Sequence, residues 1–481
     1  MAIWVMAAPV HLFFSILMMM NFELRPSCGK IAKLPLSFKD LRETQCAWNP
    51  ARRGYKFSLG TKTMNPTSSQ ASESNYRWVV LTLGAFTFTF VVAMPTMCMP
   101  VLFKEISDEL GLSLVQIGVI WGIGSFSGLF SSLIGGTLGD RYGARRTIMI
   151  ASILTALAGA IRGLALDYVT MLITVLLFGF VARAIPTNVH KICGVWFSER
   201  QLGLANGVVA MGMALGFMLG SMISATLLSP LLGGWRNVLF LYGALAMVTG
   251  FLWVFIKAPP EKLLAGEGES ETISFRKALK HVIQDKRVWL YGVVLLGFNG
   301  CVQGLLGYLP LYLREIGWAE ASADGTVASF HGASMVFVIP LALLSDRLGK
   351  RKPFFVIATL TLAMGVGALT YMQGDIIWGL VMVVGLFRDG FMAILVTAII
   401  ELEGIGSKYS GTAVGLALFL SAIGSIFSPP IGNSFAEWNL SAPFLFWAGL
   451  AALAFLAVNF IKEKTKQIKP PNLSPPSFIG E

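Results

Sequence analysis

The stretch Gly136-Thr-Leu-Gly-Asp140-Arg141-Tyr-Gly143-Ala-Arg145-Arg146 separates two long apolar runs, residues 114–138 and 147–165. Apolar runs of about 20 residues are typical of helices that span a membrane. The charged stretch between them is therefore expected to form a tight turn at the membrane surface. A related stretch lies further along the chain, Ala342-Leu-Leu-Ser-Asp346-Arg347-Leu-Gly349-Lys350-Arg351, and its aspartate follows Asp140 by 206 positions.

The composition points to a membrane protein rather than a soluble domain. Of the 481 residues, 55% are hydrophobic and only 13% are charged. Because lipid offers backbone groups no hydrogen-bond partner, a chain of this kind is expected to be an all-α helix bundle. Twelve apolar runs follow Arg77 and predict twelve transmembrane helices, at 78–101, 113–138, 146–166, 168–192, 204–229, 236–257, 288–313, 325–345, 353–372, 376–400, 411–434 and 442–461.

The basic residues alternate between loops. The net charge of +11 could suggest a nucleic-acid partner, but Lys and Arg gather around Arg141, between Lys257 and Arg287, around Arg347 and after Ile461. Cytoplasmic loops carry such an excess of positive charge. We therefore expect a multi-pass protein of the inner or plasma membrane, with both ends of the twelve-helix core in the cytoplasm and no nucleic-acid partner. The five cysteines show no metal or redox spacing, and no cofactor is expected.

The first 76 residues do not fit the span pattern. Residues 1–20 are apolar but lack the basic segment of a signal peptide, and a thirteenth span would invert the topology that the charges specify. We predict that residues 1–76 are a disordered extension or a mis-called start. The remaining chain divides into a six-helix half at 77–257, a linker at 258–287, a second half at 288–462 and a tail at 463–481.

The two halves repeat each other. Pro100-Val-Leu-Phe-Lys104-Glu105-Ile106 closes the first span, and Pro310-Leu-Tyr-Leu-Arg314-Glu315-Ile316 closes the seventh, 210 positions later. Gly179 and Gly385 lie 206 positions apart in the fourth and tenth spans. Internal repeats with a binding site between them are typical of transporters.

The two charged loops resemble the GxxxDRxGxRR motif of the major facilitator superfamily, which joins helices 2 and 3 and recurs between helices 8 and 9. The resemblance covers about residues 77–465 and is loosely nearest the cyanate/organic-anion permeases and nitrate transporters. It implies twelve helices in two pseudo-symmetric six-helix halves. In that family the motif is a latch that closes the cytoplasmic side, with its aspartate near the start of helix 11, here Gly411 and Thr412. The latch residues carried over are Gly136, Asp140, Arg141, Gly143, Arg145, Arg146, Asp346 and Arg347.

The alternative interpretation of these loops is that their arginines only follow the charge bias of cytoplasmic loops. That bias does not explain Asp140 or the glycines. Gly136 has no side chain, so another helix can approach it closely. Asp140 can cap the N-terminus of a neighbouring helix, where backbone N–H groups are free.

Ionisable residues also lie inside expected spans, where they are costly and usually functional. Arg183 lies in the middle of the fourth span, and Arg388 and Asp389 lie at the same depth of the tenth. They are candidates to bind substrate, or they form a purely structural ion-pair cluster. His190 and Lys191, about two turns deeper, are either ligands or snorkel to the surface. Arg162 is expected at the membrane interface.

Asn299 and Gln303 in the seventh span are four residues apart, and so share one helix face. They could bind a substrate, or they could be interhelical hydrogen-bonding residues.

Two buried arginines favour an anionic ligand, because a guanidinium matches the geometry of a carboxylate. Asp389 is the candidate proton-coupling site, since burial raises and a nearby Arg lowers a carboxylate pKa. We expect a monomeric secondary transporter that moves a small organic anion by alternating access, with substrate, proton and lipid bilayer as its partners.

Two comparisons with motifs of the superfamily narrow the range of candidate substrates. Nitrate transporters of the superfamily carry an arginine in helix 2, and residues 114–138 contain none. Its drug antiporters carry a GPxxGG-type string in helix 5, and Gly216-Phe-Met-Leu-Gly220 lacks that proline. The alternatives kept are a drug or metabolite exporter of the same fold and a non-transporting membrane receptor. No nucleophile or metal constellation indicates an enzyme.

Overall fold

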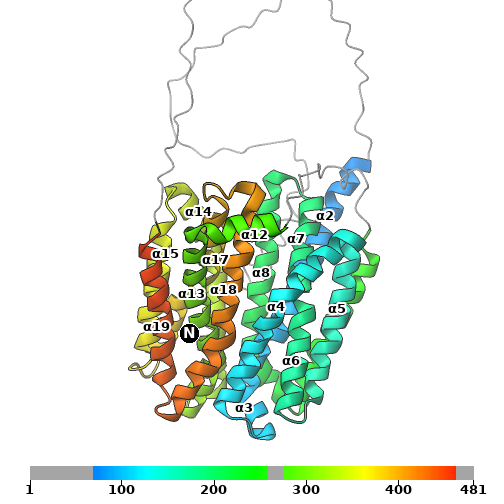
Figure 1. Ribbon diagram of the computed structural model, residues 1–481. Coiled ribbons are helices and arrows are strands. Elements are labelled where there is room, and N and C mark those ends of the chain that lie inside the picture. The colour runs from blue at the N-terminus through cyan, green and yellow to red at the C-terminus, as the bar shows by residue number, and fades with distance from the viewer. Residues whose placement is uncertain (1–68, 258–274, 462–481) are drawn as a thin grey trace, which may run out of the picture.

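The computed structural model describes residues 69–257 and 275–461, and every regular element in these ranges is helical. Most of the predicted N-terminal extension, residues 258–274 of the predicted linker and the predicted tail lie outside the described residues. Figure 1 shows the helices standing side by side in one bundle.

The first half contains six membrane-crossing units. Three of them are built from consecutive helices, because π-helical turns or a break interrupt them. The elements are α2 (Ser69–Phe86), η1 (Thr87–Ala93), α3 (Met94–Leu110), α4 (Leu114–Tyr142), α5 (Ala144–Ile161), η2 (Arg162–Leu164), α6 (Tyr168–Ala182), α7 (Ala184–Trp196), α8 (Glu199–Ile223), η3 (Ser224–Leu228), α9 (Ser229–Leu232), α10 (Trp235–Leu252) and η4 (Trp253–Phe255).

The second half begins after a short amphipathic helix, α12 (Phe275–Gln284), and repeats the same order. Its tenth crossing is again broken in two. The elements are α13 (Lys286–Glu315), α14 (Glu320–Leu348), α15 (Lys352–Ala368), α16 (Ile376–Gly385), α17 (Arg388–Ile400), α18 (Gly406–Ser434), η5 (Phe435–Glu437) and α19 (Ala442–Asn459).

Among the described residues, ten helical units are long and apolar enough to cross a membrane. The apolar segments Leu114–Gly128 of α4 and Lys352–Ala368 of α15 supply the two remaining crossings. The predicted twelve-helix, all-α class is confirmed.

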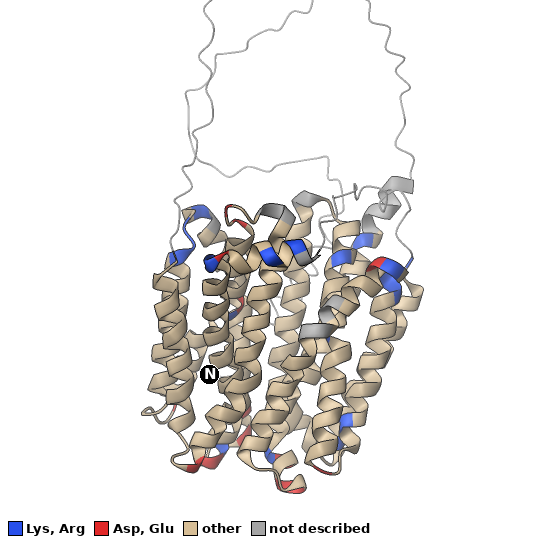
Figure 2. Ribbon diagram, in the orientation of Figure 1, with Lys and Arg blue, Asp and Glu red and all other residues tan. Residues whose placement is uncertain are grey.

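The two ends of the bundle differ in charge. Figure 2 shows Lys and Arg concentrated at the upper end, where the two motif loops and α12 lie, whereas acidic residues gather mainly at the lower end. We call the upper end, which carries the loops at Gly143 and Gly349, the basic end. The other end, which carries the loops at Gly111 and Gly317, is called the opposite end.

The halves meet along α4 and α18 near the opposite end. A Cβ atom at Gly118 would stand 2.7 Å from the backbone of Pro430, and one at Gly122 would stand 2.3 Å from the carbonyl oxygen of Ile426. Only glycine permits such an approach. Asn433 Nδ2 donates to the Leu114 carbonyl at 2.7 Å beside them.

A second seam joins α8 to α14. Its apolar part is a cluster of Met211, Ala214, Leu215, Met218, Ala328 and Met335. Towards the opposite end, the hydroxyl of Thr226 donates to Asp324 Oδ2 at 2.9 Å, and Arg314 Nη2 pairs with Asp324 Oδ1 at 2.7 Å. The Asp324 side chain is fully buried. Because Thr226 belongs to the first half and Asp324 to the second, this hydrogen bond joins the halves at the opposite end, and the ion pair with Arg314 holds Asp324 in place within the second half.

The basic end of α18 packs against α12, where the rings of His281 and Tyr409 stack with centres 4.4 Å apart. A Cβ atom at Gly411 or Gly415 would meet nothing within 4 Å. The contacts between the halves described here lie in the middle of the bundle and at the opposite end, whereas the faces of Gly411 and Gly415 at the basic end are open.

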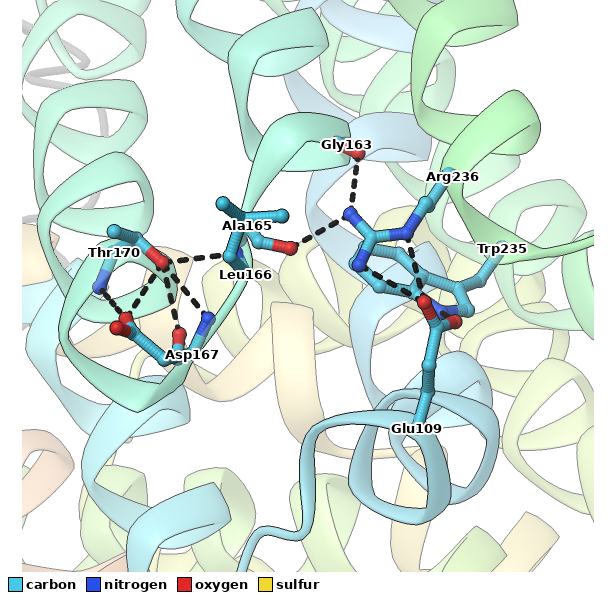
Figure 3. A network of polar contacts seen from close by, with 8 residues as sticks. All are labelled: Glu109, Gly163, Ala165, Leu166, Asp167, Thr170, Trp235 and Arg236. Carbon is cyan, nitrogen blue, oxygen red and sulfur yellow. Dashed lines mark hydrogen bonds and ion pairs between the residues drawn. The ribbon is translucent and has the colours of Figure 1, made fainter.

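Arg236 holds one corner of the opposite end together, as Figure 3 shows. Its guanidinium pairs with Glu109 of α3 and donates to the carbonyls of Gly163 and Ala165, at 2.8 and 2.6 Å. Trp235 Nε1 donates to the same Glu109 at 2.6 Å. The ends of three crossings are thereby joined within the first half.

Candidate functional site

Each half contains one broken helix at the same place in the repeat. Arg183 separates α6 from α7, and Leu386 and Phe387 separate α16 from α17, which begins at Arg388. Pro186 explains the first break, because it lacks the N–H that would bond to the Ala182 carbonyl. Broken helices near the membrane midplane expose helix ends towards bound solutes in transporters. Arg183 and Arg388 therefore lie where such a site is expected.

Arg183 extends across α4. A Cβ atom at Gly128 would stand 3.4 Å from the Arg183 Cγ, so the glycine leaves room for the arginine stem. The side chain is exposed within the bundle, and none of the described residues forms a hydrogen bond or ion pair with its guanidinium. The charge of Arg388 acts on it across the halves. An unpaired cation beside a second cation favours an anionic ligand.

Arg388 has several partners. Its Nη1 pairs with Asp389 Oδ1 at 2.6 Å, and its guanidinium carbon lies 5.1 Å from the ring centre of Phe217 on α8. Ser334 of α14 donates its hydroxyl to Asp389 Oδ2 at 2.6 Å and accepts from the Asp389 N–H. Both charged side chains remain about a quarter exposed, at 24% and 27%. The carboxylate is thus oriented from two helices while water can still reach it.

The predicted polar pair of α13 already has partners. Asn299 Nδ2 donates to Ser421 of α18 at 2.7 Å, and Gln303 Nε2 reaches the carbonyl of Trp121 on α4 at 3.5 Å. Trp121 Nε1 in turn donates to the Gln303 carbonyl at 2.7 Å. In this conformation the two residues make the interhelical contacts that were the alternative to ligand binding.

His190 and Lys191 do not lie with the central arginines. The His190 ring shares a hydrogen bond with Asn206 of α8, and Lys191 Nζ donates to the Gly136 carbonyl and to Asp140. The helix break at Arg183 separates that residue from α7, the helix that carries His190 and Lys191.

The motif loop of the first half differs in detail from the expectation. Asp140 pairs with Lys191 within its own half, and its side chain is 71% exposed, whereas Gly411 at the start of α18 has open space around it. In this conformation Asp140 is therefore bound by Lys191, and the family-based expectation that it lies near Gly411 and Thr412 is not met.

The close helix approach predicted at Gly136 occurs at its neighbours instead. A Cβ at Gly136 would make only ordinary contact, 3.8 Å from Thr187. A Cβ at Gly135 would collide with Ala184, and one at Gly139 with the Asn188 amide. Gly143 has φ of +86°, which forms the turn between α4 and α5.

The basic residues of the two loops cap helix ends. Arg145 donates to the carbonyls of Trp253 and Val254 at the end of the sixth crossing. Lys352 donates to Asn459 and Ile461 at the equivalent end of the twelfth. Cations stabilise helix C-termini in this way.

The remaining loop residues lie at the surface. Arg141 stands over the Tyr142 ring, and Arg146 and Arg347 are exposed. The side chain of Asp346 lies outside the described residues.

Two buried residues differ from expectation. Arg162 was predicted at the interface, yet it is 1% exposed; it donates to the Pro95 carbonyl at 2.9 Å and lies over the Phe178 ring. The interfacial prediction is wrong because the side chain turns into the first half instead of outwards. His331 was not predicted at all, and its only sequence signal is a histidine within the expected span 325–345.

Comparisons with known proteins agree with this architecture. The family model of the Major Facilitator Superfamily matches residues 79–402 and 315–478. A probable nitrate/nitrite antiporter of Thermus thermophilus is 27% identical, covering 78% of this chain and 90% of its own. A 3-(3-hydroxy-phenyl)propionate transporter of Escherichia coli (strain K12) is 24% identical, over 83% of this chain and 97% of its own.

Solved structures share the fold. A bacterial homologue of the human lysosomal transporter Spinster, in an inward-facing and unoccupied conformation, aligns with a TM-score of 0.66 at 14% identity, covering 80% of this chain and 97% of its own. The nucleoside transporter NupG aligns with a TM-score of 0.68 at 13% identity, covering 81% and 100%. The chain belongs to the Major Facilitator Superfamily. It is a multi-pass membrane protein and a secondary transporter of small molecules.

Proposed function

We propose that this chain transports a small organic anion, coupled to protons, and that Arg183 and Arg388 bind the anion between the two halves. The observation that carries the proposal is the guanidinium of Arg183 in the middle of the bundle, which has no partner among the described residues and is influenced by the charge of Arg388 from the other half. A cation in the membrane interior needs a compensating charge. A carboxylate between the two forks would supply it through charge-assisted hydrogen bonds.

Named relatives support an anionic substrate. Besides the two described above, the relatives include a probable sulfoacetate transporter of Cupriavidus necator and a cis,cis-muconate transport protein of Acinetobacter baylyi. Most of these names denote organic acids. For nitrate itself, the motif comparison remains unfavourable, because the apolar part of α4 carries no arginine.

Asn299, Gln303, His190 and Lys191 remain secondary candidates for substrate binding. Each already has a partner in this conformation. They would have to exchange these partners to bind a substrate, whereas Arg183 would not. The proposal therefore assigns the substrate first to the two arginines.

Asp389 is our proposed proton-coupling residue. It neighbours Arg388, is held by Ser334 and keeps access to water. Protonation would remove the negative charge that competes with the substrate for Arg388, which links the proton to the anion. In Asp389→Asn we expect exchange of substrate across vesicle membranes to persist and accumulation driven by a proton gradient to be lost. Equal loss of both in a stably folded protein would leave Asp389 no separate proton role.

The orientation of the bundle follows from its charge. We propose that the basic end faces the cytoplasm, as positive loops do. With the halves in contact at the opposite end, the described conformation would then be open to the cytoplasm. A cysteine at Leu166, in a loop at the opposite end, should be labelled only from outside, and one at Phe255 only from the cytoplasmic side.

The test of the anion proposal is a thermal-stability panel on the purified wild type. The probes are cis,cis-muconate, 3-(3-hydroxyphenyl)propionate, sulfoacetate and nitrate, with the dimethyl ester of muconate as the neutral control. A ligand at 100 times its Kd stabilises by about 2.7 kcal/mol, a readily measured shift. Stabilisation by an organic anion but not by the ester is expected. Stabilisation only by the neutral ester would instead favour the drug-exporter alternative.

Uptake into right-side-out vesicles, measured with and without a proton gradient, separates a transporter from a receptor. We expect uptake of the stabilising panel anion to depend on the gradient. Binding with no uptake under either condition would favour the receptor alternative.

A further inference from the structure

His331 is a buried imidazole without a hydrogen bond. It lies in α14 with none of its surface exposed, and neither Nδ1 nor Nε2 has a partner among the described residues. Buried polar groups are normally satisfied, and each exception calls for a specific cause. A histidine kept only for packing would be expected to find a carbonyl or hydroxyl within reach.

Two aromatic rings lie close to the imidazole. Phe217 of α8 lies on one side, with ring centres 5.1 Å apart, and Phe330 lies 5.3 Å away. Phe217 also carries the guanidinium of Arg388 at 5.1 Å from its centre. A single aromatic side chain therefore lies against both His331 and one of the two proposed substrate-binding arginines.

The charged groups around His331 are those of the central site. Arg388 acts electrostatically on the imidazole. Ser334 lies one turn further along α14, on the same helix face, and donates to Asp389. The carbonyl of Phe330 would stand 2.4 Å from a Cβ at Gly385, so α14 lies directly against the broken helix α16–α17 at this level. His331 is therefore at the depth of Arg388.

One of the two rings near His331 belongs to the other half of the protein. Phe217 is in the first half, whereas His331, Arg388 and Asp389 are in the second. In a transporter whose halves rock around a central site, α8 and α14 change their contact between states. A change in this contact would move Phe217 relative to His331 and would uncover the imidazole.

We propose that His331 is a third substrate-binding residue, which donates a ring N–H to the anion beside Arg388 and is covered by Phe217 in the present conformation. The inference rests on the proposed anion transport and adds to it a residue and a mode of exposure. A neutral imidazole N–H adds a directional donor without adding charge. It would therefore help to select an anion with an acceptor at a defined position, such as a second carboxylate or a hydroxyl.

The experiment compares His331→Leu and His331→Gln with the wild type, using the panel anion that stabilises the wild type most. Leucine fills the apolar pocket but has no donor, whereas glutamine retains an N–H donor. We expect His331→Leu to melt at the wild-type temperature or above, because an unsatisfied buried group has been removed. We expect the same variant to bind the panel anion about tenfold more weakly, and His331→Gln to stay within about threefold of the wild type.

The outcomes separate the inference from the proposed function. Unchanged affinity in His331→Leu, with the anion lost in Arg183→Ala, overturns only the role of His331. A melting temperature well below that of the wild type, or failure to fold, shows a structural histidine and also overturns it. If no panel anion stabilises the wild type, the proposed anion function fails, and the inference that rests on it fails for that reason.

Discussion

Arg183 and Arg388 occupy the same break in the two repeated halves, yet their surroundings differ. Arg183 has no partner among the described side chains and lies over a glycine. Arg388 is paired with Asp389, which Ser334 also binds, and it lies over the Phe217 ring. One half presents a bare cation, and the other presents a cation whose charge an acid already balances.

The difference shows how a duplicated scaffold can divide two tasks. The repeat sets the depth of both arginines, because equivalent helices break at equivalent positions. The side chains of neighbouring helices then decide what each arginine can do. A bare arginine gains most from an anion, whereas an arginine beside a carboxylate can respond to protonation of that carboxylate.

The largest expected effect separates the two arginines directly. Arg183→Ala should lose about 10- to 100-fold in affinity for the stabilising panel anion, since a charged hydrogen bond contributes about 1.5–3 kcal/mol. Its melting temperature should hardly change, because no described partner is left behind. Arg183→Lys should restore binding only in part, because an ammonium cannot form two parallel hydrogen bonds.

Arg388→Ala should lose as much affinity for the panel anion as Arg183→Ala does. It should also lose stability, because Asp389 would be left without its cation. Breaking a fully buried pair costs about 3–5 kcal/mol; here water reaches the pair, so about 1–3 kcal/mol is expected. Thermal unfolding with and without the panel anion measures both quantities. If the central charges are only structural, Arg388→Met combined with Asp389→Leu should recover expression and transport together, which would break the comparison.

The motif loops provide an intermediate effect. In the first half, Asp140 binds Lys191; in the second, Arg351 of the loop binds Glu401 beyond α17. Each of these two ion pairs joins a motif loop to the broken helix of its own half. We expect Asp140→Asn to insert normally and to slow turnover, through a shift of about 1.4 kcal/mol, or tenfold, between the two conformations.

The variant Lys191→Met distinguishes two explanations for slower turnover in Asp140→Asn. If Asp140 acts only through Lys191, both variants should slow uptake equally. If Asp140 also caps α18 when the basic end closes, Asp140→Asn should be slower than Lys191→Met. Wild-type uptake by a well-expressed Asp140→Asn protein would falsify the latch in either form.

The smallest expected effect concerns two aspartates that begin equivalent helices. Asp167 caps α6 by accepting from the Thr170 N–H at 2.8 Å, whereas Asp375 at the start of α16 makes no such bond. The bonds from the Thr170 backbone and hydroxyl lower the pKa of Asp167. The pKa of Asp167 is lower in the folded state than in the unfolded state. The cap therefore stabilises the folded protein at pH values above about 4, and this stabilisation is lost as the pH falls through the folded-state pKa.

We therefore expect Asp167→Ala to lower the melting temperature near neutral pH and Asp375→Ala to leave it unchanged. The difference between Asp167→Ala and the wild type should shrink in acid. Asp167→Asn is the matched control, because asparagine also caps helices well. A pH-independent loss in Asp167→Ala would assign its effect to something other than the carboxylate.

Part of the candidate site could be predicted from the sequence. Arg183, Arg388 and Asp389 were identified because a charge within an apolar span is conspicuous, and the repeat placed them at one depth. His331 carries the same signal, but only its neighbours show that it is unsatisfied and covered by Phe217. The partners of Asn299 and Lys191 lie more than 50 positions away in the chain, so no local pattern could indicate them.

The sequence by itself determined the twelve helices, the repeat of the halves and the depth of the central charges. Each of these depends on transfer into lipid or on a turn, which are properties of about 20 consecutive residues. Only the tertiary structure decided that Asp140 meets Lys191, that Arg162 is buried and that Arg183 is bare while Arg388 is paired. Those contacts depend on the rotation and crossing of neighbouring helices, which the packing of distant small side chains sets.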